Sequence, residues 1–132
     1  MTPITQIFSI RGATTLTADT QEEVVKKTTE LMAEIARRNG CLDRPDVTVV
    51  HIQITTTPDI RSFYPARAIR ESGVAPFAGA PLFSALEPPI AGGLPLCVRV
   101  MLTVTRAGGE AIEPRHIYLG GASALRPDLA QA

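Results

Sequence analysis

The pattern of apolar and polar positions along the chain predicts a sheet. Runs rich in β-branched residues at 47–56 and 96–105 are typical of strands. Shorter runs at 7–13, 82–85 and 116–119 predict further strands of the same sheet.

Two other segments carry the signals of helices. Asp19 and Thr20 are candidate N-caps ahead of apolar residues at helical spacing, and this pattern ends near Asn39-Gly40. A short helix is expected at 64–71, where Pro65 suits the first turn.

Several strands with one long and one short helix indicate an α+β fold with a mixed β-sheet. A single long helix covers only one face of such a sheet. With regular alternation, Val47 and Val49 lie on one face of their strand and Val50, Ile52 and Ile54 on the other. We therefore expect a symmetric oligomer in which the second face packs against another copy of the chain.

Arg99 interrupts the apolar strand 96–105. Alternation places it on the face opposite Val98 and Val100. Because burying an unpaired charge is costly, its guanidinium is expected either to be ion-paired or to bind an anionic ligand. Glu87 is the only acidic residue between Ser72 and Gly109, and it is either a solvated loop residue or part of a site.

Composition narrows the function classes. The 132 residues, 45% of them hydrophobic, are expected to form one domain spanning 1–132. The net charge is zero and no basic stripe is present, which argues against a nucleic-acid partner. All basic residues are arginine except Lys26 and Lys27, which reflects either a compositional bias or bidentate recognition of carboxylates.

Several kinds of chemistry find no support in the sequence. There is no glycine-rich phosphate loop, and His51 and His116 lack the spacing of metal ligands. Cys41 and Cys97 show no metal or redox spacing and are expected to be free thiols in a reducing compartment. No segment resembles a signal peptide or a membrane span, so a cytoplasmic protein without a membrane partner is expected.

What remains is a set of arginines within or at the ends of predicted elements: Arg11, Arg67, Arg70, Arg99, Arg115 and Arg126. A chain with several arginines and no activated nucleophile fits either anion binding or a reaction that needs only positioning and charge stabilisation.

Blocks of the sequence occur in an order known from one family. They are Arg11–Thr15, Thr57–Asp59, Tyr64–Glu71, Gly92–Leu94, Cys97–Met101, Arg115–Leu119 and Leu125–Leu129. Together they closely resemble the monofunctional AroH-type chorismate mutases. The resemblance implies a homotrimeric pseudo-α/β-barrel with active sites between subunits. It also implies a cofactor-free Claisen rearrangement of chorismate to prephenate, on the branch to phenylalanine and tyrosine.

The same resemblance implies roles for individual residues. Arg99 donates to the ether oxygen and a carboxylate of the substrate, and Glu87 accepts from its ring hydroxyl. Arg11 and Tyr118 bind carboxylate. The adjacent subunit's side of the cleft is lined by Tyr64, Arg67, Arg70 and Ser84, of which the first, second and fourth stand where the family often has Phe, Lys and Cys. Leu125 and Arg126 close the cleft as a flexible tail from about residue 126 becomes ordered on substrate.

Two other classes of protein remain as alternatives. A trimeric imine deaminase or metabolite-binding protein of the RidA type has a similar sheet-and-helix trimer, and fold alone does not separate the two. A non-catalytic structural trimer is the third possibility. The blocks that begin at Arg11 and Leu125 favour the mutase.

Overall fold

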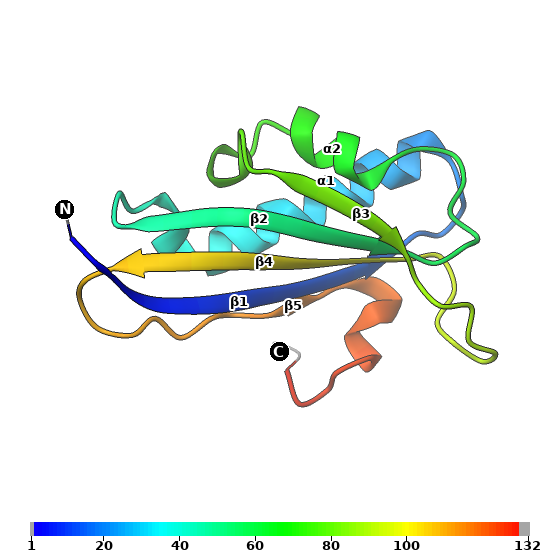
Figure 1. Cartoon of the computed structure of the whole chain (residues 1–132). Helices are drawn as coiled ribbons and strands as arrows, with labels where there is room; N and C mark the ends of the chain where they lie inside the picture. Colours follow the sequence, from blue (N-terminus) through cyan, green and yellow to red (C-terminus); the bar gives the residue numbers. More distant parts are fainter. Residues whose placement is uncertain (1, 130–132) are drawn as a thin grey trace.

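The computed structural model describes residues 2–129, so the end of the predicted flexible tail, residues 130–132, lies outside the described residues. Five strands form one sheet in the order β3-β2-β4-β1-β5 (Figure 1). Their bounds are β1 Ile4–Thr15, β2 Val47–Thr56, β3 Leu82–Leu86, β4 Cys97–Ala107 and β5 Ile117–Tyr118. The helices are α1 Gln21–Arg38 and α2 Pro65–Glu71, with short 3₁₀ helices η1 Gly40–Asp43, η2 Ala75–Phe77 and η3 Gly120–Ala124.

The sheet is mixed, as predicted. The central strand β4 runs antiparallel to both β1 and β2, whereas the edge strands β3 and β5 pair in parallel with β2 and β1. β1 is longer than the predicted 7–13 and pairs with β4 as far as Thr15, opposite Cys97. This long pairing joins β1 and β5 to the strands β4, β2 and β3.

Both helices lie on one face of the sheet (Figure 1). The long helix α1 buries Val24, Leu31, Met32 and Ile35 completely, at helical spacing. Thr20 is its N-cap, and its side chain accepts a hydrogen bond from the backbone N–H of Glu23 at 3.2 Å. The predicted start and end of this helix are therefore confirmed. No helix among the described residues is long and apolar enough to cross a membrane.

The expectation that β2 carries apolar side chains on both faces is wrong. Val49 pairs with Val104 and His51 pairs with Thr103, so Val50 is an extra residue without a partner on β4. This β-bulge shifts the alternation by one position. As a result Val47, Val49, Ile52 and Ile54 all lie on the helix-covered face, and Val50 is 40% exposed.

The opposite face, which we call the open face, is uncovered over much of its area. It carries Arg99 and Met101 of β4 beside Thr55 and Gln53 of β2. At one end of the open face, Ala122 of η3 packs against a small buried cluster of Ala13 and Cys97. Elsewhere it leaves large apolar side chains exposed, among them Ile7 and Phe83 at 70% each.

Candidate active site

A cavity of about 420 Å³, which we call cavity 1, lies on the open face. The predicted site residues that line it are Arg11 of β1, Arg99 of β4, Tyr118 of β5 and Arg126 beyond η3. Residues far apart in the sequence meet here because β1 lies between β4 and β5 in the sheet. Three guanidiniums in one cavity make a local environment that favours anions.

Arg99 has a carboxylate partner inside the chain. Its Nε lies 3.2 Å from Oε1 of Glu87, and the Arg99 side chain remains 44% exposed. Glu87 follows β3 directly, and its backbone N–H donates to the carbonyl of Thr56 at 2.8 Å. The ion-pair alternative for Arg99 is therefore confirmed, and the guanidinium also lines a cavity.

Thr55 also belongs to this arrangement, although no motif in the sequence points to it. Its hydroxyl donates to the same Oε1 of Glu87 that contacts Arg99. Thr55 lies opposite Arg99 in the pairing of β2 with β4. The register of β2 against β4 would identify Thr55 as a neighbour of Arg99. That register depends on the bulge at Val50, which the sequence does not predict.

Arg126 holds a carboxylate of its own segment in a bidentate pair. Its Nε and Nη2 lie 3.0 and 2.7 Å from the two carboxylate oxygens of Asp128. This pair lowers the pKa of Asp128 and raises that of Arg126. The guanidinium therefore lines the cavity while its Nε and Nη2 are engaged by Asp128.

His116 supports the backbone of Arg11. The Arg11 N–H donates to Nδ1 of His116 at 2.9 Å, so the histidine accepts at this nitrogen. Burial lowers the pKa of His116, and the neighbouring charges of Arg11 and Arg126 lower it further. His116 is thus a hydrogen-bond acceptor for the backbone of β1, next to β5.

The two cysteines are part of no metal-binding cluster in the described part of the chain. Cys41 and Cys97 are free thiols, as predicted, and Cys97 is buried. Burial raises the pKa of the Cys97 thiol, and the charge of Arg99 opposes this shift. Within residues 2–129, no three His, Cys, Asp or Glu side chains are grouped closely enough to hold a metal ion.

A second cavity of about 500 Å³, cavity 2, lies between α2 and the edge strand β3. Tyr64, Arg67 and Ser84 line it. The Arg67 guanidinium lies 5.2 Å from the centre of the Phe63 ring, and its Nε is 3.3 Å from Glu71. Both partners leave Arg67 about half-exposed at the mouth of the cavity.

Asp19 anchors the loop that leads into cavity 2. Its carboxylate accepts from the backbone N–H groups of Arg61 and Ser62, at 2.9 and 3.1 Å, and from the Ser62 hydroxyl at 2.6 Å. These bonds lower the pKa of Asp19. Asp19 is thus a loop anchor, whereas the other candidate, Thr20, caps α1.

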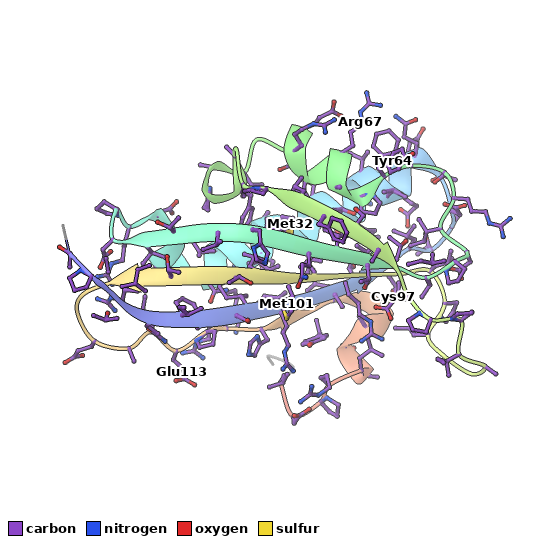
Figure 2. The ribbon with its side chains drawn as sticks, in the orientation of Figure 1. Met32, Tyr64, Arg67, Cys97, Met101 and Glu113 are labelled. Atoms are coloured by element: carbon purple, nitrogen blue, oxygen red, sulfur yellow. The ribbon has the colours of Figure 1, made fainter. Side chains whose placement is uncertain are left out.

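The two cavities lie along the edge strand β3 and hold different predicted site residues. Phe83 lines cavity 1 and Ser84 lines cavity 2, whereas Ala85 contributes to the walls of both. Figure 2 shows Tyr64 and Arg67 near α2, well apart from Met101, which lines cavity 1. The predicted site residues therefore form two separate groups in a single chain.

Three predicted residues lie outside the walls of these two cavities. Arg70 lines a further hollow together with Tyr64 and Arg67. Leu125 packs against the small cluster that contains Cys97. Glu87 lines a third hollow, of about 380 Å³, which shares Arg99 with cavity 1.

The fold and the site define an α+β protein whose open sheet face carries an arginine-rich cavity suited to a small organic anion. The comparisons with known proteins agree on one family. The model of chorismate mutase type I matches residues 7–129. Chorismate mutase AroH of Bacillus subtilis is 39% identical over 94% of this chain and 93% of its own length. Chorismate mutase AroH of Thermus thermophilus is 37% identical over 96% and 98%.

A solved structure supports the same assignment. The chorismate mutase from Clostridium thermocellum aligns with a TM-score of 0.70 at 33% identity, covering 87% of this chain and 96% of that one. The chain belongs to the type I chorismate mutase family, and it is an isomerase that acts on chorismate. The match decides between the mutase and the imine-deaminase alternative, which the fold alone left open.

Proposed function

We propose that this chain catalyses the Claisen rearrangement of chorismate to prephenate in clefts between the subunits of a homotrimer, with Arg99 and Glu87 as catalytic residues. The observation that carries the proposal is the Arg99–Glu87 pair beside a cavity lined by Arg11, Tyr118 and Arg126. The reaction is intramolecular and needs no cofactor.

Arg99 stabilises the charge that develops in the reaction. As the ether C–O bond lengthens and the new C–C bond forms, negative charge gathers on the ether oxygen. A guanidinium already held in place by Glu87 interacts more strongly with that oxygen in the transition state than in the bound substrate. The gain requires no reorganisation during the reaction, because the donor is positioned in advance.

The other groups in and beside cavity 1 hold the substrate in its compact reactive conformer. Arg11 and Tyr118 bind carboxylate, and Arg126 closes the cavity together with Leu125. Glu87 accepts a hydrogen bond from the ring hydroxyl, which orients the ring relative to Arg99. Holding both ends of the substrate supplies the positioning on which an intramolecular reaction depends.

Tyr64, Arg67, Arg70 and Ser84 complete the cleft from the adjacent subunit. Two observations support this role. In one chain these residues line the hollows around α2, and none of them lines cavity 1. The open face also leaves Ile7 and Phe83 largely exposed, and a neighbouring copy would bury them.

We also propose a cytoplasmic location. Cys41 and Cys97 are both free thiols, and unpaired cysteines are the usual state in a reducing compartment.

The proposal is tested by following the loss of chorismate by its ultraviolet absorbance. We expect rapid loss with the wild-type chain and a decrease of at least about a hundredfold with Arg99→Ala. Arg37→Ala is the matched control, because Arg37 lies on the exposed side of α1 and pairs with Glu34. No loss above the uncatalysed rate with folded wild-type protein would contradict the activity. An Arg99→Ala variant as active as the control would contradict the role of Arg99.

A further inference from the structure

Glu87 stands at a position where its backbone leaves the sheet. It directly follows β3 and precedes Pro88 and Pro89, neither of which has an N–H to donate. Its own N–H bond to the carbonyl of Thr56 is the last bond on this edge of β2 before the loop. A glutamate side chain in such a place has considerable rotamer freedom unless other side chains hold its carboxylate.

Two side chains hold that carboxylate from two different strands. The hydroxyl of Thr55, on β2, donates to Oε1 of Glu87, and Nε of Arg99, on β4, lies 3.2 Å from the same oxygen. Neither contact uses Oε2. One oxygen is therefore anchored to the sheet, while the second is left to accept from a ligand.

Thr55 is well suited to act as such an anchor. It is directly opposite Arg99 in the β2–β4 register, so a single strand pairing places both donors. Threonine is β-branched, and its χ1 angle is restricted, so holding its hydroxyl in one direction has a small entropic cost. The Glu87 side chain is only 21% exposed, and a hydrogen bond to a charged group is stronger there than in water.

We infer that Thr55 is a positioning residue for Glu87, which fixes Oε1 so that Oε2 faces the substrate hydroxyl and Arg99 keeps its orientation. This inference rests on the proposed function, because it assigns Thr55 to the same site. Thr55 itself acts through Glu87 and does not take part in bond making or breaking.

The test compares variants that remove or keep the hydroxyl. Thr55→Val preserves the shape of the side chain and removes the donor, whereas Thr55→Ser keeps the donor. We expect Thr55→Val to reduce kcat/KM by between about tenfold and a hundredfold, the range for a hydrogen bond to a charged group. We expect Thr55→Ser to stay within about threefold of the wild type, a smaller loss than that range. Thr48→Val is the matched control, since Thr48 is an exposed residue of the same strand and face.

A double-mutant cycle separates positioning from a general effect on the fold. In a Glu87→Ala background there is no carboxylate to position, so Thr55→Val should have no further effect on kcat/KM. Equal losses from Thr55→Val with and without Glu87 would overturn the inference, as would full activity of Thr55→Val. If the valine variant does not fold, Thr55→Ala is measured in the same two backgrounds and judged by the same outcomes. An inactive wild type would contradict the proposed function instead, so the two failures are distinguishable.

Discussion

Arg99 has to be held in place and at the same time left available to a ligand. The fold meets these two needs at one side chain, because Nε is paired with Glu87 while the guanidinium also lines cavity 1. A lysine ammonium is a single point charge on a flexible stem and presents no planar fork of donors. The geometry of the pair therefore requires arginine, not merely a positive charge.

Arg99→Lys should accordingly be nearly as damaging as Arg99→Ala. An ammonium that stays with Glu87 is poorly placed for the ether oxygen, so we expect a loss of about a hundredfold or more in kcat/KM. The measurement is the steady-state rate of chorismate loss for both variants. Arg37→Lys, on the exposed side of α1, is the control and should be unaffected. Near-normal turnover by Arg99→Lys would contradict this role.

His116 leads to a second prediction, which concerns how the stability of the fold depends on pH. Its pKa in the folded chain is lowered from 6.5, chiefly by burial, with Arg11 and Arg126 acting in the same direction and Glu113 against it. The unfolded chain thus binds the proton more readily, and the folded state loses stability as the pH falls through 6.5. Protonated Nδ1 also cannot accept from the Arg11 N–H.

We expect the melting temperature of the wild type to fall more steeply between about pH 7.5 and 5.5 than that of His116→Gln, since glutamine does not titrate. Both proteins are compared at one chain concentration. Asp19 and Asp128 have lowered pKa values and contribute only at more acidic pH, so they do not obscure the comparison. Parallel curves for the two proteins would show that this titration has no influence on folding.

The elements themselves were largely predictable because their signals are local. The apolar spacing of α1, its Thr20 cap and Pro65 at the start of α2 depend on residues within a few positions of each other. The bulge at Val50 was not predictable, because it is a relation between β2 and β4. Regular alternation counted from Val47 places Thr55 on the helix side, and the bulge returns it to the face of Arg99. The anchor of Glu87 was missed for this reason, whereas Arg99 and Glu87 stood out as isolated charges.

Gly12 shows how closely α1 packs against the sheet, and it leads to a prediction for these two elements. A Cβ at this position would lie 2.8 Å from Cδ1 of Ile35 and 3.2 Å from Cγ2 of Val100. We expect Gly12→Ala to destabilise the fold by about 1–3 kcal/mol through overpacking. Removing the Ile35 Cδ1 methyl in Gly12→Ala/Ile35→Val should relieve part of that cost.

The comparison is made by urea unfolding at one chain concentration. Ile35→Val alone is the control and is expected to cost about 0.5–1.5 kcal/mol. The double variant should be more stable than the sum of the two single changes predicts. Strict additivity would mean that α1 shifts away from β1 without resistance, contrary to the close packing.

At the scale of the whole molecule, one chain carries two incomplete halves of the proposed site. Cavity 1 contains the groups assigned to the substrate carboxylates and the ether oxygen, and cavity 2 contains Tyr64, Arg67 and Ser84. Phe83 is 70% exposed on the face that also carries cavity 1. A rotationally symmetric assembly would bring cavity 1 of each copy against cavity 2 of the next, and would bury this apolar surface in the same step. The uncovered sheet face still predicts an oligomer. Apolar residues on both faces of β2 do not support it, because the bulge places Val47, Val49, Ile52 and Ile54 on one face.

Mixing two inactive variants tests this arrangement directly. Arg99→Ala removes a group of cavity 1, and Arg67→Ala removes a group of cavity 2. If each cleft takes one cavity from each of two neighbouring subunits, unfolding and refolding an equal mixture should leave about a quarter of the clefts intact, since each of the two cavities comes independently from one variant or the other. Chorismate turnover should then rise to about a quarter of the wild-type value, well above either variant alone. A mixture of Arg99→Ala with Glu87→Ala is the matched control, because both changes affect the same side and no intact cleft can form. No recovery in the first mixture would place the complete site within a single chain. Recovery in the control would show instead that Arg99 and Glu87 serve one cleft from different subunits.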